Sequence, residues 1–173
     1  MNLKRTLHLI LTAASLIAGT ARSADAPLRP VGVARTDITP DYPIRLTGYG
    51  DRAAESSGVA QRLFGKALAI GGDADGPAVL VTVENCGVSA AIRDEVVRRL
   101  GEKTKVVSDR FALCSTHTHT APMLVGFAPN IFSADLPAEH QATVERYTRE
   151  VTDKIEQVAL AALADRKPAR LAW

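Results

Sequence analysis

The chain has 173 residues, of which 46% are hydrophobic, with 21 Lys and Arg against 19 Asp and Glu. Three of the basic residues, Lys4, Arg5 and Arg22, lie in the first 23 positions, so the remaining 150 residues carry 18 basic and 19 acidic side chains. This length suffices for one domain with a hydrophobic core. The nearly neutral charge lacks the basic excess of a nucleic-acid-binding protein, and we expect no nucleic-acid partner.

The first 23 residues have the pattern of a secretory signal peptide. A basic start precedes an apolar stretch at residues 6–17, and a small-x-small cleavage signal follows at residues 21–23, with an alternative at residues 24–26. The apolar stretch is too short to span a bilayer. We therefore expect removal of residues 1–23 and a secreted or periplasmic protein formed by residues 24–173.

The first half of this region predicts strands. Strand-like runs occur at residues 31–37, 44–47, 63–70 and 78–83, separated by glycine, proline and polar turn residues. The run at residues 78–83 is almost wholly apolar, which predicts a strand covered on both faces. The Gly-Tyr-Gly at residues 48–50 allows a tight turn or a close approach to a ligand, and we favour the turn.

A βαβ unit follows. A helix is predicted from Ser89, as its N-cap, to Gly101, and the next strand covers residues 110–115. Strand, helix and strand over this length predict two parallel strands joined by a right-handed crossover. The charged side chains of the helix are expected on its solvated face.

The carboxyl ends of two such parallel strands meet at one edge of the sheet, where open α/β sheets bind ligands. Glu84 and Cys86 follow the first strand, and Cys114, His117 and His119 end the second. Glu84 has an alternative role beside a helix N-terminus. The two cysteines can form a disulfide in an exported protein or can be small buried residues, and we favour burial.

The stretch Thr116-His-Thr-His-Thr-Ala-Pro122 is the main candidate site. In extended backbone His117 and His119 point to the same side and can bind one metal ion, although two solvated polar residues would give the same pattern. The alternating threonines offer hydroxyls to the imidazole rings or to a polar substrate atom. Pro122 places the pair at the end of a strand.

The C-terminal half predicts one long helix. Residues 123–136 are apolar and irregular, and they suit either the wall of an apolar cavity or a loop packed on the core. A helix follows from Pro137 to Asp165, with His140 exposed in its first turn, and a strand begins at Pro168. The predicted fold is therefore α/β: a mixed sheet containing a right-handed βαβ unit, with a long helix packed on it, in an incomplete domain.

Four segments of the chain resemble the N-terminal catalytic domain of neutral/alkaline non-lysosomal ceramidases. These are residues 31–40 (Val-Gly-Val-Ala-Arg-Thr-Asp-Ile-Thr-Pro), residues 48–50, the strand that ends in Val83-Glu84, and residues 116–122. The resemblance implies a secreted or surface zinc hydrolase that cuts the amide of ceramide into sphingosine and a fatty acid. It also implies a sphingolipid substrate, with peripheral membrane contact, and residues 24–173 as the N-terminal part of the catalytic domain.

By the same resemblance, His117 is a zinc ligand, and His119 lines the site and contacts the substrate or the bound water. The chain departs from the family where Thr120-Ala-Pro122 replaces the usual Ser-Gly-Pro and Glu84 replaces a frequent Asp. The family's other ligands, a second His, a Glu and a Tyr, lie far downstream of the motif, and no His follows His140 here. We therefore expect poor or absent activity from this chain, with a non-enzymatic exported domain or another amide or ester hydrolase as the alternatives.

Overall fold

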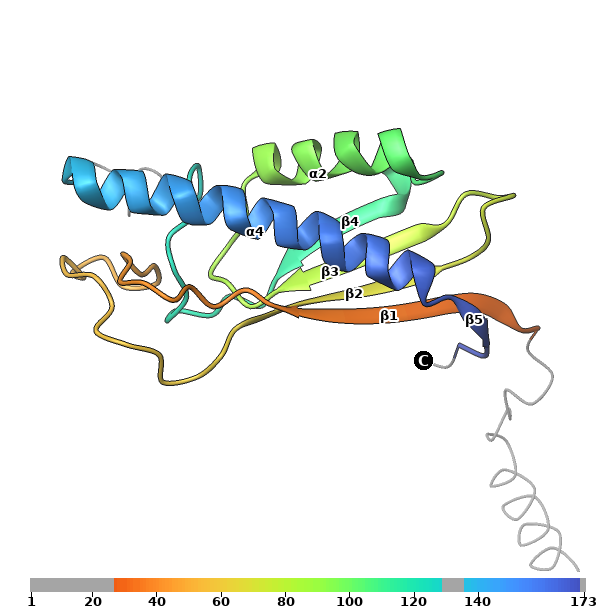
Figure 1. The fold of residues 1–173 in the computed structure, drawn as a ribbon, viewed down its shortest axis with the longest axis horizontal. Helices are drawn as coiled ribbons and strands as arrows, with labels where there is room; N and C mark the ends of the chain where they lie inside the picture. The colour runs from red at the N-terminus through yellow and green to blue at the C-terminus, as the bar shows by residue number, and fades with distance from the viewer. Residues whose placement is uncertain (1–26, 129–135, 172–173) are drawn as a thin grey trace, which may run out of the picture. The chain divides into compact units, whose positions relative to one another are not determined.

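The polypeptide forms a five-stranded mixed sheet with the strand order β4-β3-β2-β1-β5 (Figure 1). The structure is a computed structural model that describes residues 27–128 and 136–171, so the predicted signal peptide lies outside the described residues. The strands are β1 (Arg29–Asp37), β2 (Phe64–Ile70), β3 (Ala78–Val83), β4 (Phe111–Ser115) and β5 (Lys167–Ala169). The predicted α/β class with a mixed sheet is confirmed.

The βαβ unit is confirmed by the strand pairing. β3 and β4 are parallel, whereas β1 pairs antiparallel with both β2 and β5, and β2 pairs antiparallel with β3. The crossover helix α2 (Ala90–Lys103) starts directly after Ser89, as predicted, and runs past the expected stop at Gly101. Thr104 ends it instead, because both its backbone N–H and its hydroxyl donate to the Leu100 carbonyl at 2.8 Å.

The long helix α4 (Ala138–Ala164) covers one face of the sheet. Figure 1 shows α2 on the same side, beside α4. The strands present small or β-branched residues to the helices, among them Gly32, Ala67 and Val81. A Cβ atom added at Gly32 would lie 2.0 Å from the Ala162 carbonyl oxygen, so this glycine sets how closely α4 approaches β1.

The opposite face of the sheet is exposed, which corrects one prediction. Val33 on β1 and Leu80 on β3 are 61% and 40% exposed, although the apolar run of β3 predicted burial on both faces. Val79, Val81 and Val83 are buried under the helices, and the residues between them alternate to the other side. An apolar run does not show by itself how many faces of a strand are covered.

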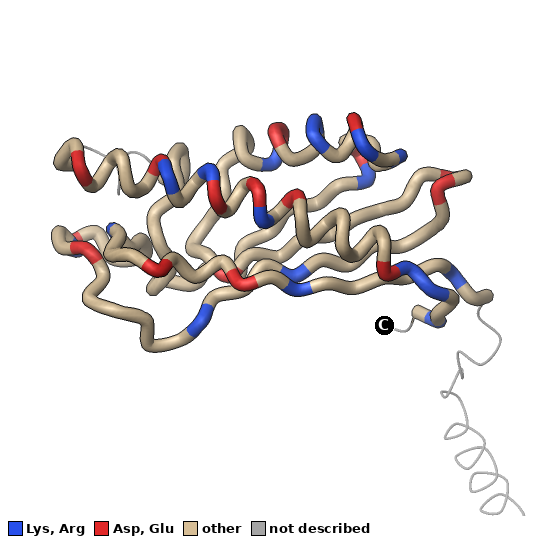
Figure 2. The backbone as a smooth tube through the Cα atoms, viewed as in Figure 1, with Lys and Arg blue, Asp and Glu red and all other residues tan. Residues whose placement is uncertain are grey.

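Charged residues link the two helices, although we predicted the charges of α2 as solvated. The Arg99 guanidinium on α2 lies 2.6 Å from the Asp153 carboxylate and 3.3 Å from the Glu156 carboxylate on α4. Glu156 is buried to 7% exposure, and its second oxygen pairs with Lys103. Figure 2 shows acidic and basic residues along both helices. The ion pairs therefore connect α2 and α4 at the edge of their contact.

Two further segments differ from the prediction. Residues 44–47, predicted as a strand, form isolated bridges from Arg45 to Glu55 and from Leu46 to Pro122. β5 begins one residue before the predicted Pro168, and the end of the predicted strand at residues 172–173 lies outside the described residues. Within residues 27–128 and 136–171, no helix is long and apolar enough to cross a membrane.

Candidate metal centre

The parallel pairing of β3 and β4 brings the ends of both strands to one edge of the sheet. Beyond β4, the Thr116 N–H donates to the Val83 carbonyl at 3.0 Å, and the Thr118 N–H donates to the Asn85 carbonyl at 3.0 Å. The His117–His119 segment therefore runs beside the residues that follow β3. The sequence predicted this juxtaposition from the βαβ unit alone.

His117 and His119 face each other, as predicted, but the backbone reason is different. Their Nε2 atoms lie 2.9 Å apart, and the ring planes meet at 74°. The predicted extended backbone is interrupted at His117, whose φ angle of 61° lies in the left-handed region. A non-glycine residue in this region is strained by about 1–2 kcal/mol, and such strain is concentrated at functional sites.

Cys86 is the third member of this cluster. Its sulfur lies 3.9 Å from His117 Nδ1, and the Sγ atom and one nitrogen of each imidazole all lie within 4.8 Å of one another. Cys86 and Cys114 are both free, with Cys86 buried and Cys114 exposed. The sequence allowed a disulfide between these two described residues, but the structure has none. Burial was predicted for both cysteines and is confirmed for Cys86 alone.

The hydrogen bond to the Cys86 carbonyl determines which nitrogen of His117 carries the proton. Nδ1 lies 2.8 Å from the Cys86 carbonyl oxygen, which can only accept, so Nδ1 carries the proton. A neutral His117 then directs the lone pair of Nε2 toward His119. Histidines that ligate metals are usually fixed in this way by a carbonyl or carboxylate on the other nitrogen.

Asn85 holds the two strand ends together. Its side chain is fully buried, donates from Nδ2 to the Pro122 carbonyl at 3.0 Å, and accepts at Oδ1 from the Gly87 N–H at 3.2 Å. We did not single out Asn85 from the sequence. Its position between Glu84 and Cys86, directly after a buried strand, was the available signal.

His119 is held by the loop that contains the Gly-Tyr-Gly segment. A Cβ atom at Gly48, whose φ angle is 104°, would lie 2.5 Å from the His119 Cα and Cβ atoms. Tyr49 packs edge-on against the His119 ring at a centroid distance of 5.2 Å, and Arg52 donates to the His119 carbonyl at 2.9 Å. Gly48 thus serves a close approach as well as the predicted turn.

Glu84 does not converge with the imidazoles, which corrects its predicted place. Its carboxylate turns toward β2, where it accepts from the Phe64 N–H at 2.9 Å and pairs with Lys66 Nζ at 2.7 Å. The alternative role at a helix N-terminus is also wrong, because α2 begins only at Ala90. His140, expected to be exposed, is also different: its side chain is 19% exposed, and its Nε2 lies 3.9 Å from a Glu55 oxygen.

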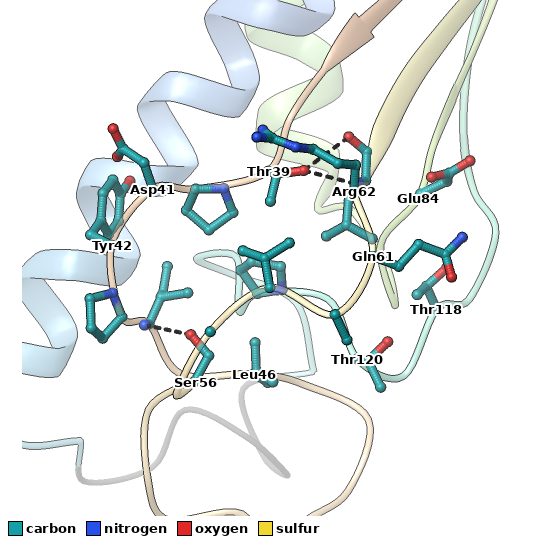
Figure 3. A pocket seen from close by; sticks show the side chains of 18 of the residues that line it. Thr39, Asp41, Tyr42, Leu46, Ser56, Gln61, Arg62, Glu84, Thr118 and Thr120 are labelled. Carbon is teal, nitrogen blue, oxygen red and sulfur yellow. Dashed lines mark hydrogen bonds between the residues drawn. The ribbon is translucent and has the colours of Figure 1, made fainter.

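A pocket of about 890 Å³ lies on the other side of the motif, lined by Thr116, Thr118 and Thr120, whereas the two histidines lie outside its described lining. In Figure 3, Glu84 and Thr118 lie toward one side of this pocket and Tyr42 toward the other. The hydroxyls of Thr116 and Thr118 lie 2.8 Å apart. The apolar lining comes from the loops between β1 and β2 and from the end of the motif: Pro40, Tyr42, Pro43, Ile44, Leu46, Val59, Leu63 and Pro122.

The apolar segment at residues 123–132 does not form the described wall of this pocket. Met123 and Leu124 are 1% exposed and belong to the core, and residues 129–132 lie outside the described residues. Of the two predicted roles, packing on the core is therefore confirmed for Met123 and Leu124, and the cavity wall is wrong for these two residues.

Tyr42 is a titratable side chain at the far end of the pocket, next to Asp41. Burial, together with the 2.6 Å hydrogen bond that Tyr42 donates to Glu150, raises the pKa of the Tyr42 phenol well above its usual value. Burial would raise the pKa of Glu150 as well, but the hydrogen bonds from Tyr42 and Arg146 lower it. Tyr42 is therefore a neutral hydroxyl at neutral pH.

The donor set of the cluster fits zinc. Zinc accepts imidazole nitrogen and thiolate sulfur, and catalytic zinc sites commonly have three protein ligands with a fourth position open. Cys86, His117 and His119 offer three such donors at one edge of the sheet.

Comparison with known proteins identifies the family of the chain. Residues 30–169 match the profile of the family described as neutral/alkaline non-lysosomal ceramidase, N-terminal. The neutral ceramidase of Drosophila pseudoobscura pseudoobscura is 27% identical over 146 residues, covering 76% of this chain and 20% of that protein. The neutral ceramidase of Drosophila melanogaster is 28% identical over 116 residues, covering 59% of this chain and 16% of that protein.

The fold is also similar to a solved structure. The crystal structure of neutral ceramidase from Pseudomonas aeruginosa superposes with a TM-score of 0.65 at 24% identity, covering 83% of this chain and 23% of that chain. The chain thus spans about a fifth of the length of these relatives. Because the family profile covers most of the 173 residues, the chain belongs to the neutral/alkaline non-lysosomal ceramidase family.

Proposed function

We propose that residues 24–173 form the N-terminal part of a zinc-dependent amidohydrolase domain that cuts the N-acyl amide of ceramide into sphingosine and a fatty acid. The observation that carries this proposal is the 2.9 Å approach of the two Nε2 atoms of His117 and His119 at the carboxyl edge of the sheet. Membership of the ceramidase family supports the substrate class.

His117 is the proposed metal ligand. Its Nδ1–H is occupied by the Cys86 carbonyl, so Nε2 is the nitrogen that remains free to bind. When bound, zinc polarises a carbonyl and lowers the pKa of its bound water to about 7, which makes attack on an unactivated amide feasible at neutral pH.

His119 is the proposed catalytic side chain. Its ring is held between Tyr49 and His117, and its carbonyl accepts from Arg52, so the imidazole has a defined position. From that position it can contact the substrate and hold or transfer a proton, the usual role of histidine near neutral pH.

The pocket beside the motif is the proposed place for part of the lipid. Its volume of about 890 Å³ is within the range of small-molecule sites, and its lining combines apolar side chains with the hydroxyls of Thr116, Thr118 and Thr120. A sphingoid base has the same combination of an apolar chain and polar groups. A lipid substrate also fits the proposed export and peripheral contact with a membrane.

We expect the 173-residue chain to hydrolyse ceramide poorly by itself. The resemblance implies further ligands downstream of the motif, and the chain covers about a fifth of its relatives. The test combines zinc stoichiometry with hydrolysis of a panel of N-acyl substrates that includes ceramide. Stoichiometric zinc that His117→Ala abolishes, with little turnover, is the expected result.

Clear turnover of ceramide by this chain would refute the expected inactivity, and preference for another amide or ester would refute the substrate. A non-enzymatic exported domain is the second candidate, favoured by one specific feature: the two Nε2 atoms are also close enough for one imidazole to donate a hydrogen bond to the other. In that case the protein would contain no metal, and chelation would leave its stability unchanged.

A further inference from the structure

The pocket beside the motif has one polar end, and the carboxylate at that end has no role in the proposed hydrolysis. Figure 3 shows Gln61, Glu84 and Thr118 on one side of the pocket and Tyr42 on the other. Apolar side chains, among them Leu46, also line the pocket. A pocket of this kind fits a ligand with a polar head and a hydrocarbon chain.

We propose that this pocket holds the amino-alcohol half of the lipid, the sphingoid base, and that Glu84 selects the head of this half over the carboxylate of the fatty acid. The proposal rests on the proposed function, which puts part of a ceramide in the pocket. It adds which half enters and which residue decides this. The head lies at Glu84 and Thr118, and the hydrocarbon chain extends toward Tyr42.

The Glu84 carboxylate is held in place and keeps acceptor sites for a ligand. The Glu84 N–H donates to the Phe64 carbonyl at 3.0 Å, and the Phe64 N–H donates to Glu84 Oε2 at 2.9 Å, so β2 fixes both the main chain and the side chain. Lys66 Nζ donates to Oε1 at 2.7 Å. A carboxylate has about four lone-pair sites, so about two remain beside these described bonds.

The threonine hydroxyls at the same end also favour a hydrogen-bond donor. The Thr116 hydroxyl donates to the Val83 carbonyl at 3.5 Å and lies 2.8 Å from the Thr118 hydroxyl. Because the Thr116 hydrogen is used in this way, the Thr118 hydroxyl donates to Thr116 and keeps its lone pairs for a ligand. The head of a sphingoid base has hydroxyl and ammonium hydrogens for Glu84 and Thr118, whereas an ionised fatty acid has none to donate.

The charged side chains of the described lining favour a cation as well. Asp41 and Glu84 are acidic, and Arg62 is the basic member. The Arg62 guanidinium pairs with the Asp37 carboxylate at 3.0 Å, which offsets its charge. Lys66 competes for Glu84, but its side chain is 53% exposed and lies outside the described lining. An ammonium head therefore lies beside opposite charge, and a carboxylate head would lie beside like charge.

The experiment is isothermal titration calorimetry of the 173-residue chain at neutral pH with three ten-carbon probes below their micelle concentrations: a sphinganine analogue, decanoate and decanol. The amine of the sphinganine analogue is protonated under these conditions. We expect it to bind about tenfold more tightly than decanoate, the effect of one charge-assisted hydrogen bond, with decanol between the two. Glu84→Gln should abolish this preference. Decanoate binding as tightly as the sphinganine analogue would overturn the proposal.

Asp41→Asn is the matched control, because it removes an acidic side chain at the Tyr42 end of the same pocket. It should keep the preference for the sphinganine analogue. If Asp41→Asn abolishes the preference and Glu84→Gln does not, the assigned position of the head is wrong. Lys66→Met removes the competing cation and should raise the affinity for the sphinganine analogue. If circular dichroism shows that Glu84→Gln does not fold, a lower affinity in Lys66→Met would still overturn the proposal.

A second pair of variants tests where the probe binds. Val59 and Val33 are 55% and 61% exposed, and of these two valines only Val59 lines the described pocket. Val59→Trp places a bulky ring at the pocket and should weaken binding of the sphinganine analogue, whereas Val33→Trp should not. Equal effects of the two substitutions would place the bound probe elsewhere and overturn the proposal.

The proposed metal site is tested separately by titration with Co²⁺, which replaces zinc and absorbs visible light. His117→Ala should abolish cobalt binding and leave the affinity for the sphinganine analogue unchanged, because the histidines lie outside the described lining of the pocket. A preference for the sphinganine analogue in a chain that binds no cobalt would support the role of Glu84 and count against the proposed function. Cobalt binding by a chain that does not bind the sphinganine analogue would overturn the role of Glu84 and leave the metal site intact.

Discussion

The helix-covered face of the sheet and its carboxyl edge are stabilised in different ways. The face is held by apolar side chains of the strands and of both helices, whose buried members include Val81, Leu100 and Ile155. The edge is held by hydrogen bonds between polar groups, most of them to the backbone, around Asn85 and His117. The packing of the face depends on the volumes of its side chains, whereas the edge depends on the directions of its hydrogen bonds. The comparison shows how a small sheet can support a polar site at its edge beside an apolar core.

Truncating the core should produce the largest loss of stability. Leu100 on α2 is fully buried, so Leu100→Ala should lower the free energy of unfolding by about 2–5 kcal/mol, because it removes buried surface and leaves a cavity. Urea denaturation followed by circular dichroism measures this change.

Leu80→Ala is the control for this substitution. The same side chain on the open face is 40% exposed, so its removal should cost much less than that of Leu100. Equal losses for the two variants would show that the open face is as buried as the covered one. Below its unfolding midpoint, Leu100→Ala should still bind cobalt, because the edge of the sheet is not altered.

Disturbing the edge should give a smaller loss of stability and a clear loss of metal. Asn85→Ala leaves the Pro122 carbonyl and the Gly87 N–H without their side-chain partner, at a cost of about 1–3 kcal/mol. Cobalt titration should show weaker binding, because the donors on the two strand ends are no longer held together.

Thr118→Ala is the control at the same edge. It removes a hydroxyl on the pocket side and keeps the backbone hydrogen bond from Thr118 to Asn85. We expect unchanged cobalt affinity. If Asn85→Ala also binds cobalt as the wild type does, then the edge does not depend on this amide, and the contrast between the two regions is weaker than we infer.

The smallest effect is expected at the exposed surface of α2. Hydrogen bonds from Arg98 and Arg99 lower the pKa of Glu95 to about 2. A carboxyl whose pKa is lower in the folded state stabilises the protein above its ordinary pKa of 4.5, and this stabilisation is lost as the pH falls toward 2. Glu95→Gln should remove this part of the pH dependence.

Thermal unfolding of both proteins between about pH 5 and pH 2 provides the measurement. The difference between wild type and Glu95→Gln should be greatest at the upper end and should shrink on acidification. Because Glu95 is exposed to solvent, added salt should reduce the difference further. A difference that grows on acidification would contradict the stabilising effect assigned to the ionised Glu95 carboxylate.

Much of the fold could be predicted because its strongest patterns are local. Alternating or continuous apolar residues predicted β1, β2 and β3, and a long apolar stripe predicted α4. The structure confirms the bounds of these elements within one or two residues. The parallel pairing of β3 and β4 followed from the length of the crossover. The strand predicted at residues 44–47 was wrong because a short apolar run does not show whether neighbouring backbone continues the pairing.

The candidate site was predicted in part. The approach of His117 and His119 was expected, whereas the left-handed backbone at His117 was not, because no residue type in the motif demands it. The roles of Asn85 and Cys86 depend on which way their side chains point at a strand end. The direction of the Glu84 side chain could not be predicted either. Glu84 was expected at the same edge as the histidines, but its carboxylate turns toward Lys66.

The sequence by itself determined the order of the elements, the βαβ unit, the placement of the motif at a strand end and the family resemblance. These follow from residue type and spacing along the chain. Only the tertiary structure decided that Cys86 joins the two imidazoles, that Glu84 leaves them, and that the threonines and not the histidines line the pocket. Those outcomes depend on backbone angles and contacts between residues distant in sequence, which spacing alone does not specify.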